Sequence, residues 1–152
     1  MERRKALKTV AVAALAVGGT ALLADGHGKK NHDIPSKDGM NRVKMTPADP
    51  KNPTNYELKH MPEIKLGKTD KKGFTTVKIT VGQNGIIHPS TADHWIDYIE
   101  LWADNKLVGR TELLPVVSRG YDSYKVNIKG FKKLTAVAGC NLHGIWEDSI
   151  TL

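Results

Sequence analysis

The chain has 152 residues, enough for one domain of ordinary size, with 23 basic, 16 acidic and six histidine side chains and a formal net charge of +7. Four of the basic residues and one acidic residue lie within residues 1–24, so the remainder carries 19 basic and 15 acidic side chains. This mild excess, spread along the chain, argues against nucleic-acid binding and predicts a solvated lysine-rich surface that attracts small anions. A single cysteine excludes an intramolecular disulfide and any site built from four cysteines.

Residues 1–24 have the three-part layout of an export signal. Arg3 and Arg4 open a charged stretch that ends at Lys8, and an uncharged run from Thr9 to Ala24 follows. The run is short for a membrane span, and the paired arginines resemble a twin-arginine signal. We therefore expect an exported, periplasmic or otherwise extracytoplasmic protein that keeps no stable membrane contact after signal removal. The alternative is a membrane anchor formed by an uncleaved signal.

Residues 25–56 are rich in Lys, Asn, Asp, Pro and Gly and have hardly any periodic apolar pattern. Such a composition predicts a polar linker or an extended N-terminal arm. His27 and His32 lie in this segment, and we interpret both as solvated loop residues.

Residues 57–152 show the alternation of apolar and polar residues that is typical of half-buried antiparallel strands. In residues 74–81, for example, Thr75, Val77, Ile79 and Val81 share one face. The predicted strands are 61–66, 74–81, 94–102, 106–114, 123–129, 134–139 and 147–152. Residues 94–102 are apolar on both faces and predict a central strand, and no stretch has a helical period. We expect an all-β fold, an immunoglobulin-like antiparallel β-sandwich of about seven strands.

The candidate metal ligands are the only cysteine, Cys140, and the four histidines outside the linker, His60, His88, His94 and His143. Cys140 and His143 are three residues apart, so a tight turn can direct both side chains toward one point. The histidines all lie at predicted strand ends or in loops, and loops at one end of a sandwich converge. Any one of them alone is more often structural, but together they predict a metal site.

The motifs around these residues resemble those of the superoxide reductases, above all the one-domain neelaredoxin type, which is related to the iron-site domain of desulfoferrodoxin. The resemblance rests on residues 88–101 (HPSTADHWIDYIEL), 108–110 (VGR) and 140–147 (CNLHGIWE), and residues 59–62 (KHMP) fit the family's first ligand motif. It extends from about residue 57 to the C-terminus, with the motifs in the family's order.

The resemblance implies a mononuclear iron site. His60, His88, His94 and His143 would bind iron in a plane, and Cys140 would bind axially as a thiolate that donates electron density. The implied reaction is the one-electron reduction of superoxide, with two protons, to hydrogen peroxide. The implied electron donor is a small redox protein, either rubredoxin-like or a c-type cytochrome. Homo-oligomers are common in the family, so we expect one here.

The residues before His60 match the family at one position and differ at another. Lys59 matches the family's lysine beside the open iron position, where an ammonium would attract superoxide and orient a proton-donating water. The family often has a glutamate two residues before the first histidine, which closes the sixth position of oxidised iron. Leu58 stands there in this chain, and Glu57 would point to the opposite side of an extended segment. We predict that oxidised iron keeps an open or water-bound sixth position.

Two alternatives remain open. A cupredoxin-like electron carrier is also a β-sandwich with Cys and His near its C-terminus, but its site normally has two histidines, one cysteine and an axial methionine. No methionine follows Cys140, and two histidines would be left over. The second alternative is a binding module that carries a sulfur group on Cys140 without metal, in which case His88 and His94 would be dispensable.

Overall fold

The structure is a computed structural model that describes residues 39–152. The predicted export signal, His27 and His32 lie outside the described residues. None of the helices in the described part is long and apolar enough to cross a membrane. The elements, in chain order, are α1 (Asn55–His60), β1 (Pro62–Thr69), β2 (Thr75–Val81), β3 (Ile96–Ala103), β4 (Lys106–Glu112), β5 (Tyr121–Val126), β6 (Lys133–Cys140) and β7 (Gly144–Thr151).

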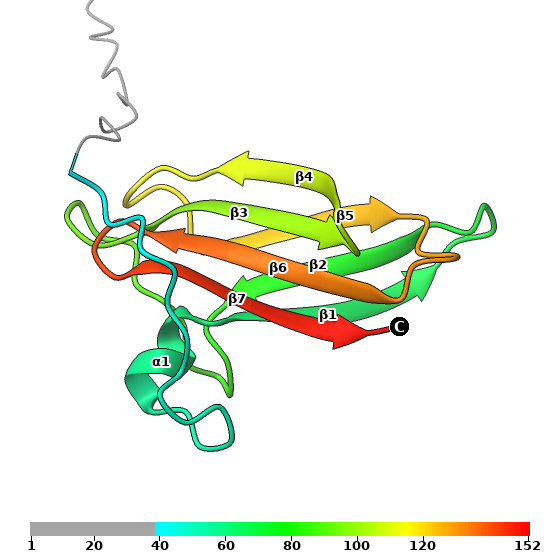
Figure 1. The fold of residues 1–152 in the computed structure, drawn as a ribbon. Helices are drawn as coiled ribbons and strands as arrows, with labels where there is room; N and C mark the ends of the chain where they lie inside the picture. Colours follow the sequence, from blue (N-terminus) through cyan, green and yellow to red (C-terminus); the bar gives the residue numbers. More distant parts are fainter. Residues whose placement is uncertain (1–38) are drawn as a thin grey trace, which may run out of the picture. The chain divides into compact units, whose positions relative to one another are not determined.

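The seven strands form two sheets, one with the order β1-β2-β5 and one with the order β4-β3-β6-β7 (Figure 1). Neighbouring strands are antiparallel throughout both sheets. The predicted all-β antiparallel sandwich is therefore confirmed. The prediction of a central strand is also confirmed, because β3 lies between β4 and β6.

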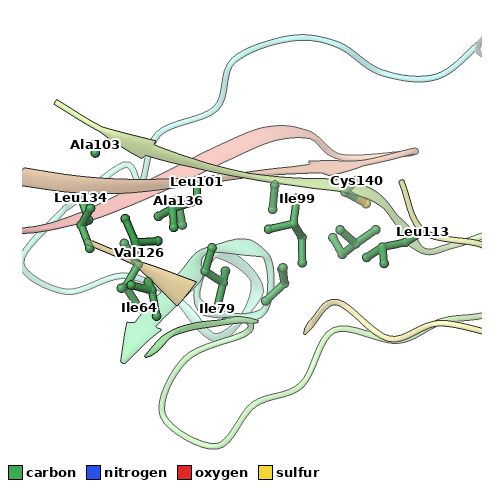
Figure 2. Close-up of a cluster of buried hydrophobic side chains, with 14 residues drawn as sticks. Ile64, Ile79, Ile99, Leu101, Ala103, Leu113, Val126, Leu134, Ala136 and Cys140 are labelled. Carbon is green, nitrogen blue, oxygen red and sulfur yellow. The ribbon is translucent and has the colours of Figure 1, made fainter. Parts of the chain in front are cut away.

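The core between the sheets consists of the inward faces of these strands. In β2, the face predicted from alternation is buried, with Val77, Ile79 and Val81 fully inaccessible to solvent. Burying one such side chain stabilises the fold by about 1.5–3 kcal/mol. Figure 2 shows that Cys140 lies at one end of this cluster. The sole cysteine thus borders the core at the edge of the sandwich.

The prediction that the chain has no helix was wrong, because α1 precedes the first strand. Thr54 caps it: the Glu57 N–H donates to Thr54 Oγ1 at 3.3 Å, and the Thr54 N–H donates to Glu57 Oε2 at 2.7 Å. This reciprocal pair is a capping box, whose sequence signature is Thr followed three residues later by Glu. With only six residues, α1 is too short to produce a helical period.

Residues 41–45 of the N-terminal arm lie against the start of β7. The Met45 N–H donates to the Ile145 carbonyl and the Ile145 N–H donates to the Val43 carbonyl, both at 2.8 Å, and Lys44 forms a parallel bridge with Ile145. Gly144, with φ of +83°, allows this approach, because a Cβ there would collide with the Val43 carbonyl oxygen. The arm therefore covers the turn between β6 and β7.

Candidate metal centre

The five candidate ligands come from four places in the chain that meet at one end of the sandwich. His60 ends α1, His88 and His94 lie in the loop between β2 and β3, Cys140 ends β6, and His143 lies in the turn before β7. Strand pairing explains the convergence, since Ile96 at the start of β3 and Gly144 at the start of β7 both pair with Cys140. In Figure 1 these strand ends lie on the same side as α1.

Two of the histidines are held by backbone carbonyls through Nδ1. His60 Nδ1 lies 2.7 Å from the carbonyl oxygen of Tyr56, and His88 Nδ1 lies 2.7 Å from that of Pro89. A carbonyl can only accept, so Nδ1 of each ring carries the hydrogen and Nε2 carries the free lone pair. This arrangement is common for histidines that bind metals, because it fixes both the tautomer and the ring orientation.

His143 presents its other nitrogen to the same point. Its Nδ1 lies 2.9 Å from His60 Nε2, 3.1 Å from His94 Nε2 and 3.5 Å from Cys140 Sγ. One ligand atom from each of His60, His88, His94 and Cys140 also lies within 4.8 Å of the others. Four ring nitrogens and one sulfur are therefore gathered around a single point.

These separations fit a bound metal ion. Two nitrogens bound at right angles to one metal, with bonds of about 2.1 Å, lie about 3.0 Å apart. The nitrogen pairs His143–His60 and His143–His94 have this spacing. Moreover, His88 Nε2 is buried and has no hydrogen-bond partner, which is costly unless a metal ion accepts its lone pair. The residues present therefore fit a metal ion that takes imidazole and thiolate ligands.

The electrostatics keep the histidines neutral, which is the form that binds metals. Burial lowers the pKa of His60 to about 4 and that of His88 to about 3, because a charged ring loses its hydration there. Burial also lowers the pKa values of His94 and His143, and the positive charge of Lys59 lowers both further. All four lone pairs are therefore free at neutral pH.

Cys140, in contrast, binds a metal only in its charged form, as a thiolate. Burial raises the pKa of its thiol, while the backbone N–H groups of His143 and Leu142 act in the other direction. Its side chain is fully buried and lies next to the apolar core. The free thiol is therefore inert, and a bound cation is what would convert it to a thiolate.

Aromatic rings close the centre on one side. The Trp146 ring is buried, stacks on His60 with an angle of 20° between the planes, and donates from Nε1 to the His143 carbonyl at 2.9 Å. The half-exposed Tyr56 ring contacts His60 and His143, with centroid distances of 4.6 and 5.3 Å. These contacts fix the orientation of two imidazole rings and exclude water from one face of each.

The three residues before His60 have different surroundings. Lys59 is half-buried, and its Nζ lies 5.8 Å from the centroid of the Tyr56 ring, within reach of a cation–π interaction. Leu58 is buried. The Glu57 carboxylate is occupied by the helix cap and also accepts from the Ala48 N–H at 2.8 Å. We expected Glu57 to point away because the segment would be extended; in fact the segment is helical and the cap holds the carboxylate.

A β-sandwich with four imidazole nitrogens and one thiol gathered at one end has the ligands of a candidate histidine–cysteine metal centre. Residues 52–149 match the model of the desulfoferrodoxin family. The superoxide reductase of Thermococcus kodakarensis is 35% identical over 106 residues, which cover 62% of this chain and 87% of that protein. The chain belongs to the desulfoferrodoxin family, and the resemblance seen in its motifs is confirmed.

Solved structures show the same relationship. The superoxide reductase of Giardia intestinalis is 33% identical with a TM-score of 0.53, and the match covers 62% of this chain and 98% of that one. A neelaredoxin from Archaeoglobus fulgidus is 29% identical, also with a TM-score of 0.53, over 71% of this chain and 95% of that one. The fold of the described residues is therefore that of the superoxide reductases.

The structure brings all five predicted ligands together and places the charge of Lys59 close enough to affect each of them. That these residues bind iron stays a prediction. Sequence reasoning missed Tyr56, Asn141 and Trp146, although the last two lie inside the quoted motif. Two features of the sequence could have indicated them. Asn141 is a polar residue between two candidate ligands, and Trp146 is an aromatic residue shortly after them.

Proposed function

We propose that the protein reduces superoxide to hydrogen peroxide at a mononuclear iron. The observation that carries the proposal is the convergence of four ring nitrogens and one sulfur in a member of this family. The proposed ligands are His60, His88, His94, Cys140 and His143.

The class of enzyme follows from the family: the chain is an oxidoreductase that acts on superoxide. The proposed reaction consumes one superoxide anion, one electron and two protons and yields one hydrogen peroxide. A bound ferrous iron would supply the electron. The four imidazoles and the Cys140 thiolate would hold it, and the thiolate would donate electron density to it.

Lys59 is the residue proposed to attract the substrate and to help protonate it. Burial is the main cause of the shifted pKa values of the four histidines and of Cys140, and the positive charge of Lys59 acts on each of these groups as well, lowering their pKa values. The same charge attracts the superoxide anion toward the metal. A water molecule held by the ammonium group is the proposed proton donor.

Replacing Lys59 with glutamine will lower the second-order rate constant for superoxide by about tenfold at low ionic strength, since the attracting charge is lost. The dependence of this rate constant on salt will also become weaker. Stopped-flow mixing at several salt concentrations measures both effects. Lys129→Gln is the matched control, because Lys129 is exposed and follows β5, whose last residue pairs with the first residue of β2, at the end of that strand away from His88. Equal effects of the two substitutions would contradict a local role for Lys59.

We further propose that no carboxylate closes the sixth iron position. Glu57 is committed to the backbone N–H groups of Thr54 and Ala48, and hydrogen bonds from these groups hold its pKa below the usual value. Glu57→Gln will therefore leave the visible spectrum of the ferric protein unchanged and lower the melting temperature through the weakened cap. Ferric spectra recorded at several pH values check this. A spectral shift in the variant would show that Glu57 reaches the metal.

We propose the partners from the family resemblance and the location from the N-terminal sequence. A small redox protein, rubredoxin-like or a c-type cytochrome, is the proposed electron donor, and the protein is proposed to form a homo-oligomer. Export by the twin-arginine route is proposed from residues 1–24. Mass spectrometry of the mature N-terminus in the periplasmic fraction distinguishes a cleaved signal from an uncleaved anchor.

The decisive experiment for the function is anaerobic purification, metal analysis and stopped-flow mixing with superoxide. We expect one iron per chain and stoichiometric peroxide without evolved oxygen. Evolved oxygen would indicate a dismutase, and copper in place of iron would support the cupredoxin-like alternative.

A further inference from the structure

The amide side chain of Asn141 joins the two loops that carry three of the candidate ligands. Its Oδ1 accepts from the Trp95 N–H at 2.9 Å, and its Nδ2 donates to the Asp93 carbonyl at 2.7 Å. Asp93 and Trp95 are the two neighbours of His94. Asn141 itself lies in the turn between Cys140 and His143 and is only 7% exposed.

The backbone of Asn141 is also engaged on both sides. Its N–H donates to the Trp95 carbonyl at 3.2 Å, and its carbonyl accepts from the Asn41 N–H at 2.8 Å. Asn41 Nδ2 then donates to the Leu142 carbonyl at 3.0 Å. Asn141 is thus held between the His94 loop on one side and the N-terminal arm on the other.

The fold needs such a connection at this place. The pairing of β3 with β6 is irregular between Ile96 and Tyr98, and its last pair joins Ile96 to Cys140. Beyond that pair the strand ladder ends, and the backbone contact with the His94 loop is the hydrogen bond from the Asn141 N–H to the Trp95 carbonyl. An asparagine amide carries a donor and an acceptor, as a peptide group does. The Asn141 side chain therefore bonds to the backbone on both sides of His94, as a further residue of a paired strand would.

We propose that Asn141 is a positioning residue of the metal centre, one that fixes His94 relative to Cys140 and His143. The inference rests on the proposed iron site. Metal ligands bind well only when their mutual distances are set in advance, and loss of an orienting hydrogen bond costs about 10–100-fold in metal affinity or activity. Through these hydrogen bonds, Asn141 controls how firmly iron is held.

The test measures metal release rather than turnover. Full-length iron-loaded Asn141→Ala is mixed anaerobically with a chelator, at a temperature where circular dichroism shows the protein fully folded. We expect iron release at least about tenfold faster than from the wild type. In the ferric form, we also expect a shifted thiolate-to-iron absorption band, because the relative placement of Cys140 and the histidines changes.

Val126→Ala is the control for a loss of stability alone. Val126 is buried in β5 of the other sheet and contacts the core rather than the ligand loops. We expect it to lower the melting temperature without changing the iron-release rate or the absorption band. If Asn141→Ala and Val126→Ala release iron equally fast, the positioning role is refuted.

A second variant covers the case in which Asn141→Ala does not fold. Asn141→Asp has the same shape and can still accept from the Trp95 N–H, but it cannot donate to the Asp93 carbonyl. It is expected to release iron faster than the wild type, and a rate equal to that of the wild type would overturn the proposal. A wild-type protein without iron would instead refute the proposed function, so the two failures are distinguishable.

Discussion

Replacing Cys140 with serine will reduce the rate constant for superoxide by more than about 100-fold while the sandwich stays folded. A serine hydroxyl is not deprotonated at neutral pH and donates far less electron density than a thiolate, so the proposed axial ligand is lost. Loss of an outer partner of a metal ligand already costs about 10–100-fold, so loss of the ligand itself must cost more. Stopped-flow kinetics with superoxide, metal analysis and the visible spectrum measure the effect.

Ala138→Ser is the matched control for this substitution. Ala138 precedes Cys140 by two residues in β6, faces the same core and is equally buried. It therefore reports the cost of placing a hydroxyl in this core without touching the metal centre. We expect Ala138→Ser to lower the melting temperature and to keep the wild-type rate constant. A Cys140→Ser variant within tenfold of the wild-type rate would contradict an axial thiolate.

Replacing His88 with alanine will remove the stabilisation that metal binding provides. A ligand present at 1,000 times its dissociation constant stabilises the folded state by about 4 kcal/mol. For a domain of this size, chelation should therefore lower the melting temperature of the wild type by about 10 °C or more. The variant, which lacks a buried ligand, should contain much less than one iron per chain, and chelation should leave its melting temperature unchanged. Calorimetry with and without chelator measures this difference.

The metal-free proteins provide the control, because the alanine variant also loses packing around a fully buried ring. Comparing wild type and variant after chelation isolates that packing loss, and the remaining difference belongs to the metal. A variant that keeps one iron per chain would show that His88 is not a ligand.

The strands of this protein were predictable from local alternation, since burial on one face of a sheet repeats every second residue. The β2 face was predicted residue by residue, and the pairing of β3 between two strands followed from its apolar residues on both sides. The helix α1 was missed because six residues produce no period, although Thr54 and Glu57 carry the capping-box signature.

The sequence by itself determined the family, through motifs that hold His60, His88, His94, Cys140 and His143 at familiar spacings. Only the tertiary structure decided how these residues meet. It leaves Nε2 of His60 and of His88 free by binding their Nδ1 atoms to carbonyls, and it places Nδ1 of His143 2.9 Å from Nε2 of His60. These choices depend on contacts between segments far apart in the chain, which no local pattern encodes.

The same reason explains the roles of Glu57 and Asn141. Spacing alone placed Glu57 on the far side of an extended segment, whereas the fold directs its carboxylate into a cap with Thr54 and Ala48. In the sequence, Asn141 is only a polar residue between two proposed ligands. Its function as a link to the His94 loop exists only because β3 and β6 pair and bring Asp93 and Trp95 beside it.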